Sequence, residues 1–457
     1  MKRLLLISIS MLFASCSFDN KTGIWKDASN IPLENQETRS IESNATNNKY
    51  EDFFSKKGTF NEEKKSLNFS NFESTEPTKV KNWLEQFATP TNNISNFFYA
   101  DNKILLSKSR KLSSAGSDQN YLNSNIVFYK NNLISYDHRG TIFIYSLSLK
   151  KKIFKYNFYQ KNFKNIKKKI NLLINKNFLY VSDNLGYLYA LNLDNNSIVW
   201  AKNYGVPFRS NLKFMNNQIF LANQDNYVYS IDADTGNKNW QFATSPTFLK
   251  SDFENNFALD PINNNLFFLN TSGELYSFNH KQQNINWVLN FRSTTVAEDT
   301  ELFLSQPIAI KNNNIIITTE KTVLSYDTLR GSRNWLLPAE SIFKPIITLN
   351  HTYFILKNNL LICLDNKDGN VVWSQNIFSY TKDKKVQEKF HSVIDFKIVN
   401  NKINIYSKNG YLLSFNSNNG NLSYLSKISK NGIKSEVIFL DGNMLFIDNS
   451  NKLLKFN

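Results

Sequence analysis

The sequence has little cysteine, proline or glycine for its length, and its charged residues are few. Two cysteines, Cys16 and Cys363, among 457 residues exclude a disulfide framework and a zinc site built from thiolates. Because 41% of the residues are hydrophobic, 14% aromatic and only 20% charged, the chain is neither wholly disordered nor a polytopic membrane protein. The length suits several domains or one large closed architecture.

Acidic residues are outnumbered by basic ones. The chain has 54 Lys and Arg against 38 Asp and Glu, which gives a formal net charge of +16. This surplus would suit an acidic partner, but the sequence is also rich in Asn, Tyr and Phe, a bias that fits an AT-rich coding sequence. We therefore predict no nucleic-acid partner. The lysine-rich stretches 164–169 and 382–389 are interpreted as solvated loops, with a membrane-facing or partner-facing patch as the alternative.

The N-terminus has the pattern of an export signal. Lys2 and Arg3 precede the apolar residues 4–14, a run too short to span a bilayer as a helix, which takes ~20 residues. Two small residues then stand before Cys16, an arrangement that resembles the lipobox of bacterial lipoproteins. We predict that residues 1–15 are removed, which leaves a charge of 16 − 2 = +14, and that Cys16 is lipidated. An ordinary signal peptide with a chance cysteine is the alternative.

The residues after the cysteine indicate location and a linker. Ser17 stands where an aspartate, in enteric-type bacteria, marks retention at the inner membrane, so the resemblance implies the outer membrane, with the protein facing the periplasm. Residues 16–78 are polar, rich in Ser, Asn, Glu and Lys, and lack sustained periodicity. We interpret them as a flexible tether that follows the lipidated cysteine. The lipid is the only membrane attachment that we expect.

A repeat with a fixed internal spacing fills most of the remaining chain. In the unit that closes at Trp240, Gly236 lies four residues earlier, Asp232 eight, and the apolar Ile231 and Tyr229 nine and eleven. About four short strands per 40 to 50 residues is typical of a propeller blade. Seven units keep this frame with varying completeness, and their closing aromatics stand 38 to 51 residues apart: Phe154, Trp200, Trp240, Trp287, Trp335, Trp373 and Tyr424.

Each position of the repeat has a physical interpretation. The two apolar residues share one face of a strand, the Asp ends it by bonding turn amides, and the Gly permits a positive φ. The Trp lies on the next strand and packs against a neighbouring sheet. Phe456 and Asn457 begin an eighth unit that the chain does not finish, and Trp83 is a closing Trp without its unit. We predict an all-β, eight-bladed propeller of four-stranded blades over 79–457, closed by pairing of the C-terminal strand with the segment around Trp83.

Recognisable catalytic chemistry is absent from the sequence. The repeat resembles that of pyrroloquinoline-quinone-type propellers, so a periplasmic quinoprotein-like oxidoreductase is one alternative. Those enzymes use acidic and amide calcium ligands and commonly a vicinal disulfide, and neither is recognisable here. Cys363 lies in an apolar stretch and is interpreted as a buried small hydrophobe. We predict no catalytic residues, metal or cofactor, because no nucleophile motif or phosphate loop occurs and the histidines lack ligand spacing: His138, His280, His351 and His391.

The lipobox, the polar tether and the eight-bladed ring together resemble the BamB family of outer-membrane barrel-assembly lipoproteins. Three segments match the family in order: residues 207–210 (Pro-Phe-Arg-Ser), 259–261 (Leu-Asp-Pro) and 306–308 (Gln-Pro-Ile). The resemblance implies a scaffold without enzymatic activity. It would dock on the periplasmic POTRA domains of the barrel component BamA, as a monomer within a larger complex, and help outer-membrane proteins to fold. Unfolded clients could add a strand to a sheet edge.

The resemblance also implies docking residues. An arginine in the loop after a blade-closing Trp carries much of the family's contact, and Arg209, next to Phe208, is its counterpart. A planar guanidinium suits an interface anchor, although a loop arginine paired with a local carboxylate is the alternative. The family also uses acidic residues before the proline that corresponds to Pro307, where this chain has only Asp299 and Glu301 slightly upstream. A module that binds anionic glycans or lipid headgroups is a further alternative.

Overall fold

The computed structural model contains two units, Met1–Lys56 and Lys57–Asn457. In the first, strand β1 (Cys16–Phe18) pairs antiparallel with β2 (Trp25–Asp27). The structure describes the backbone of these two strands and residues 59–66, 75–112, 126–159, 163, 165–246, 256–292, 303–379, 387 and 392–457.

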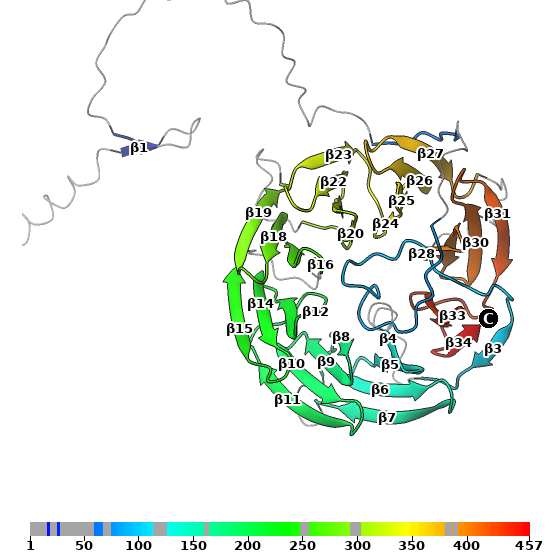
Figure 1. The fold of residues 1–457 in the computed structure, drawn as a ribbon, viewed down its shortest axis with the longest axis horizontal. Coiled ribbons are helices and arrows are strands. Elements are labelled where there is room, and N and C mark those ends of the chain that lie inside the picture. The colour runs from blue at the N-terminus through cyan, green and yellow to red at the C-terminus, as the bar shows by residue number, and fades with distance from the viewer. Residues whose placement is uncertain are drawn as a thin grey trace, which may run out of the picture. The chain divides into compact units, whose positions relative to one another are not determined.

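The described residues of the second unit form eight four-stranded antiparallel sheets arranged in a ring (Figure 1). The first strands of neighbouring blades contact one another, as β4 does β8 and β16 does β20, so these strands surround the axis of the ring. In seven blades the remaining strands follow in chain order toward the outside, and in the eighth the outermost strand is β3. This architecture confirms the predicted eight-bladed β-propeller.

Each blade has four strands, ordered from the axis of the ring outward. The first three blades comprise β4 (Val127–Tyr129), β5 (Asn132–Tyr136), β6 (Thr141–Ser146) and β7 (Lys151–Asn157); β8 (Ile170–Asn175), β9 (Phe178–Asp183), β10 (Tyr187–Asn192) and β11 (Ser197–Asn203); β12 (Lys213–Met215), β13 (Gln218–Ala222), β14 (Tyr227–Asp232) and β15 (Lys238–Ala243). The next two comprise β16 (Asn256–Asp260), β17 (Asn265–Leu269), β18 (Glu274–Asn279) and β19 (Asn284–Asn290); β20 (Ala309–Lys311), β21 (Asn314–Thr318), β22 (Val323–Asp327) and β23 (Arg333–Leu337). The last three comprise β24 (Ile346–Ile347), β25 (His351–Ile355), β26 (Leu360–Asp365) and β27 (Val371–Asn376); β28 (Val393–Val399), β29 (Lys402–Ser407), β30 (Tyr411–Asn416) and β31 (Leu422–Lys427); β32 (Ile438–Leu440), β33 (Asn443–Ile447), β34 (Leu453–Phe456) and β3 (Leu105–Lys108).

The sequence repeat falls on the third and fourth strands of a blade and on the turn between them. In the third blade, the Asp232 carboxylate accepts a hydrogen bond from the amide of Thr235 at 2.8 Å, and Gly236 adopts a φ of +70°. A β-bulge lies between Ser230 and Ile231, and the seven blades that carry the sequence repeat share it at the same place. The Asp and Gly therefore have the turn roles that the spacing predicts.

The closing Trp of one blade packs on the turn of the next. The Trp335 indole donates a hydrogen bond to the Asn366 carbonyl at 3.0 Å, and a Cβ placed on Gly369 would lie 2.5 Å from the Trp335 ring. The glycine is thus required both for its φ of +71° and because an indole covers it. The same pairing joins three further Trp residues to the glycine of the following blade: Trp200 to Gly236, Trp287 to Gly331 and Trp373 to Gly420.

Trp240 is the exception to this contact. The following blade has Gln283 at the glycine position, and the Trp240 indole nitrogen is buried without a hydrogen-bond partner among the residues that the structure describes. Trp240 packs instead against Phe278, with ring centroids 4.8 Å apart. The loss of the repeat's glycine in the sequence therefore coincides with loss of the bond between these blades.

The ring is closed by the two ends of the propeller, but not at the predicted segment. The eighth sheet has the order β3-β34-β33-β32, and Leu105 of β3 pairs with Phe456 of the C-terminal strand. The prediction that this strand pairs with the segment around Trp83 was therefore wrong. Trp83 pairs with Phe128 of the axial strand β4 and is 1% exposed, so it lies inside the ring and closes no blade.

Two other segments differ from what the sequence suggested. Residues 59–66 fall within the range predicted as a tether, yet Phe60 donates its amide to Pro338 and Lys64 pairs with Ser374 on the outer strand β27. In the first lysine-rich stretch, Lys168 is 1% exposed and donates to backbone carbonyls, so it is not a solvated loop residue. The second stretch, 382–389, lies outside the described residues except for one position.

The hydrophobic core lies between adjacent blades rather than at one centre. Cys363 has no exposed surface and packs in the cluster that contains Trp373 and Phe415. Burial raises the pKa of its thiol well above the ordinary value. This confirms the interpretation of Cys363 as a small buried hydrophobe.

Candidate functional site

The site expected from the sequence lies on one face of the ring. In an antiparallel four-stranded blade, the turn between the second and third strands lies at the same end as the link that leaves the fourth strand. The links between blades and these turns therefore share one face of the ring. A hydrogen bond of 3.1 Å from the Phe208 amide to the Asp183 carbonyl joins such a link to such a turn. We call this side the connection face.

The link 204–212, which we call the Arg209 loop, joins β11 to β12. Phe208 is 3% exposed and packs edge-on against Tyr204 and Tyr229, with centroids 5.6 and 6.1 Å away. The Arg209 amide donates to the Ala222 carbonyl at 3.0 Å, and the side chain is half-buried. Phe208 thus holds the loop between two blades, and Arg209 retains partial exposure on the connection face.

The other residues of the predicted docking site are not tested by this geometry. Asp299 and Glu301 lie outside the described residues, which resume in this link at 303. Cys16 is described only as backbone within β1. The acidic part of the docking site and the lipidation of Cys16 therefore stay predictions.

A stretch that sequence reasoning assigned to blade closure crosses the inside of the ring. This axial segment, residues 80–100, runs between the innermost strands and bonds to all eight blades, and Figure 1 shows it as the blue trace within the ring. Successive contacts are Trp83 to Phe128, Leu84 to Ile174, Glu85 to Lys213, Pro90 to Leu259, Thr91 to Ile310, Asn93 to Ile347, Phe97 to Ile398 and Ala100 to Gly442.

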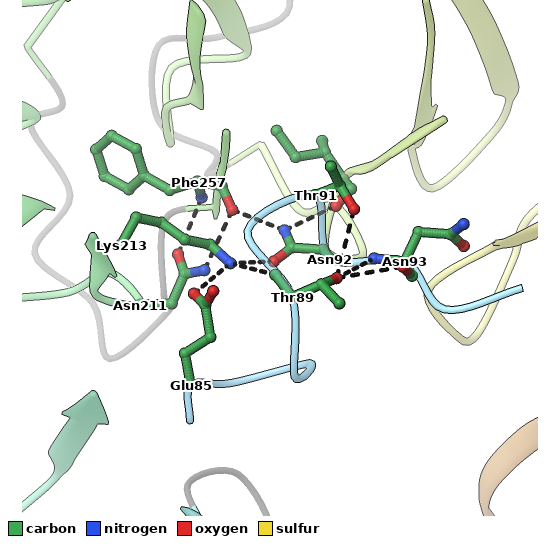
Figure 2. A network of polar contacts seen from close by, with 9 residues as sticks. Glu85, Thr89, Thr91, Asn92, Asn93, Asn211, Lys213 and Phe257 are labelled. Atoms are coloured by element: carbon green, nitrogen blue, oxygen red, sulfur yellow. Dashed lines mark hydrogen bonds and ion pairs between the residues drawn. The ribbon is translucent and has the colours of Figure 1, made fainter. Parts of the chain in front are cut away.

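A buried ion pair fixes the axial segment (Figure 2). Lys213 of β12 has no exposed side-chain surface, and its ammonium lies 2.8 Å from the Glu85 carboxylate. The same ammonium donates to Asn92 Oδ1 at 2.6 Å and to the Thr89 carbonyl at 3.0 Å. Burial raises the pKa of Glu85 and lowers that of Lys213, while their mutual attraction opposes both shifts.

Asparagine side chains continue this network between blades. The Asn92 amide donates to the carbonyls of Phe257 in β16 at 2.7 Å and of Ile308, just before β20, at 2.9 Å. Asn211 exchanges hydrogen bonds of 3.0 and 3.1 Å with the backbone of Phe257. These amides supply hydrogen bonds to buried peptide groups in β16 and next to β20.

A cavity of about 230 Å³ lies where the axial segment meets the links between blades. We call it the axial cavity. Inside it, the Lys397 ammonium lies 2.9 Å from Asp395 and 2.7 Å from Glu436. Burial lowers the pKa of Lys397, but the two carboxylates outweigh this and raise it overall, while burial lifts the pKa of Asp395 to about 6. Burial and the charge of Lys397 lower the pKa of Lys344, on another wall, to about 7.

Three further properties of the described residues bear on chemistry. In this part of the chain, no group of three or more His, Cys, Asp or Glu side chains is placed to hold a metal ion, and no helix is long and apolar enough to cross a membrane. His280 and His351 are buried in separate blades, and burial lowers the pKa of each.

Comparison with known proteins finds relatives of this propeller. Residues 166–375 match the family described as outer membrane protein assembly factor BamB. The propeller is BamB-like. None of the curated proteins matches the chain. BamB from Moraxella catarrhalis superposes on 78% of this chain and 99% of its own, with a TM-score of 0.60 and 11% identity.

The BamB-like propeller also shares its fold with enzymes. The quinohemoprotein alcohol dehydrogenase of Comamonas testosteroni gives a TM-score of 0.59 at 10% identity, covering 83% of this chain and 81% of that one. The enzyme ADHIIG of Pseudomonas putida HK5 gives 0.58 at 10%, covering 82% and 80%. At such identities the likeness establishes the fold alone, so function must be argued from the site.

Proposed function

We propose that this protein is a non-enzymatic scaffold of outer-membrane barrel assembly. It is anchored through a lipid on Cys16, faces the periplasm, and docks by its connection face on the POTRA domains of a BamA-like component. Support comes from the BamB-like family match over 166–375, the BamB-like fold and the lipobox pattern before Cys16. In this role the propeller assists folding and insertion of outer-membrane β-barrel proteins.

The Arg209 loop is the observation that carries the proposal. Backbone bonds fix it on both sides: Phe208 donates to Asp183 of its own blade at 3.1 Å, and Gln224 of the next blade donates to Pro207 at 2.9 Å. With Phe208 buried, the loop loses little freedom when a partner binds, which favours affinity. Nη1 of the Arg209 guanidinium is buried, and the remaining N–H groups can donate to a carboxylate of the partner.

The docking proposal is tested with a reversal of charge. We expect Arg209→Glu to weaken binding of the chain from residue 17 onward to purified BamA-type POTRA domains by about 30-fold, the loss of an interface hot spot worth roughly 2 kcal/mol. Biolayer interferometry measures the affinity, and circular dichroism checks the fold. Arg139→Glu is the matched control, because Arg139 is exposed in a turn of the same face.

The possible results separate the interface from the function. If Arg209→Glu binds as wild type does, the Arg209 loop is not the docking site. If wild type itself does not bind the POTRA domains, the scaffold function is wrong for this chain. Equal weakening by both charge reversals would indicate long-range attraction from the net charge instead of a specific contact.

A further inference from the structure

The axial cavity holds more cations than anions. Lys344, Lys397 and Lys434 line it together with two carboxylates, Asp395 and Glu436. Both carboxylates are within 3 Å of the same ammonium, that of Lys397, at 2.9 and 2.7 Å. The Lys434 ammonium donates to the Asn451 side chain at 2.8 Å. One positive charge in the cavity therefore exceeds what its acidic residues neutralise.

Lys344 is the lysine of the cavity whose ammonium has no hydrogen bond to a side chain among the described residues, whereas Lys397 has two carboxylates and Lys434 has Asn451. Among the residues that the structure describes, its ammonium has a hydrogen bond of 3.3 Å to the Pro345 carbonyl and lies 5.7 Å from the centre of the Phe87 ring. The residue is half-buried and lines the cavity, and burial is the main cause of the lowered pKa of its ammonium. A desolvated ammonium without a counter-ion is unfavourable, and a bound anion would relieve that cost.

The uncharged wall of the cavity is mostly apolar, with three polar side chains, Gln86, Gln306 and Ser435. Its apolar side chains include Trp83, Phe87 and Ile94 of the axial segment and Phe343, Ile346 and Phe396 of the neighbouring blades. A volume of about 230 Å³ lies below the roughly 300–1,000 Å³ of typical ligand pockets, so the cavity suits a small ligand. An apolar wall disfavours strongly hydrated dianions such as phosphate and favours a ring or alkyl chain.

We propose that the axial cavity binds a small monocarboxylate with an aromatic or aliphatic body, its carboxylate on the Lys344 ammonium and its body against Phe87 and Phe343. The ligand is either a free carboxylic acid or the C-terminal residue of a protein chain, because both present one carboxylate beside an apolar group. This site is separate from the Arg209 loop and does not depend on the docking function.

Calorimetric titration of the full-length protein in detergent micelles tests the site with 3-phenylpropionate as the probe. We expect saturable binding of one equivalent at pH 6.5, and at least about tenfold weaker binding of 3-phenylpropanol, which has the same ring without the charge. Absence of saturable binding, or equal binding of the alcohol, would overturn the proposal.

Variants assign the carboxylate to Lys344. Lys344→Gln should weaken binding about tenfold or more, Lys344→Arg should retain it, and Lys321→Gln, an exposed lysine on the same face, should have no effect. Lys344→Gln removes a cation that burial disfavours, so its melting temperature should not fall. Wild-type affinity in Lys344→Gln would refute the assignment.

The pH dependence gives a second readout. Affinity should fall as pH rises from 6.5 to 8.5, because Lys344, with a pKa lowered to about 7, loses its proton over this interval. The facing groups are Asp395 and Lys397 on β28, Glu436 and Lys434 on the following link, and the Lys213–Glu85 pair. Asp395, whose pKa is about 6, gains negative charge over a lower interval and acts in the same direction. Lys344→Gln should keep only that lower part, and an unchanged profile would contradict the role of Lys344.

A peptide arm identifies the source of the ligand. A hexapeptide that ends in Phe is titrated with a free and with an amidated C-terminus. Binding of the free form alone identifies a chain terminus as a ligand, and binding of 3-phenylpropionate without either peptide identifies a free acid. Equal binding of both peptide forms would show that the carboxylate is not recognised and would refute the proposal.

Discussion

Replacing Lys213 with Met should destabilise the propeller by about 3–5 kcal/mol, because it removes one partner of a buried ion pair. Methionine nearly matches the length of the aliphatic stem, so packing changes little. The Glu85 carboxylate, with 9% of its side chain exposed, loses its counter-charge. Asn92 Oδ1 and the Thr89 carbonyl lose their donor as well.

The pH dependence of this loss has a defined sign. Burial already holds the pKa of Glu85 above its usual value in the presence of Lys213, and removal of the ammonium raises it further. An acid whose pKa is higher in the folded state stabilises that state most below its unfolded pKa, and this contribution is lost as pH rises through the folded pKa. The deficit of the variant should therefore be largest at pH 7.5 and should shrink toward pH 5.

Urea unfolding followed by tryptophan fluorescence measures the deficit at both pH values. The double variant Lys213→Met with Glu85→Gln should be more stable at pH 7.5 than Lys213→Met alone, since no charge stays buried. Lys357→Met is the matched control, because Lys357 pairs with Glu340 at 3.0 Å but is 70% exposed, and should cost less than about 1 kcal/mol. An equal cost for the two lysines, or a deficit independent of pH, would refute the reasoning.

The contacts between blades lead to two further predictions, measured by thermal unfolding. Gly369→Ala should cost at least about 1–2 kcal/mol more than Gly205→Ala: both glycines have φ above +70°, but only at 369 would a Cβ meet an indole, whereas 205 faces open space. Equal costs would mean that backbone conformation alone fixes the glycine. Trp373→Phe should cost about 1–3 kcal/mol more than Trp240→Phe, because only the Trp373 indole donates a hydrogen bond, to Ser417 at 3.1 Å. A larger loss at Trp240 would contradict this account.

The repeat could be read from the sequence because its determinants are local. Asp232, Gly236 and Trp240 lie within nine residues of one another, and each has a chemical role in one turn and two strands. Spacing of 38 to 51 residues then predicts the blades and their number. What the spacing did not predict is the second role of the glycine, which the indole of the preceding blade covers.

The site was only partly predictable. The resemblance pointed to Arg209 and Phe208, and the structure places both in one fixed loop, with Phe208 as its buried support. The axial segment was missed because a lone Trp83 gives the same sequence signal whether it closes a blade or lies inside the ring. The polar residues of the axial segment, such as Glu85 and Asn92, are typical of an exposed loop. No neighbouring residue in the sequence indicates that the segment is buried.

The sequence by itself determined the strand periodicity, the turn chemistry and the eightfold repetition, since these depend on residues a few positions apart. Tertiary structure decided which segment completes the last blade, what fills the axis and where a cavity remains. Those outcomes rest on pairs such as Glu85 with Lys213, 128 residues apart, and Ser109 with Leu453, 344 apart. Such pairs meet only when the ring closes, so their partners are chosen by the geometry of eight converging blades.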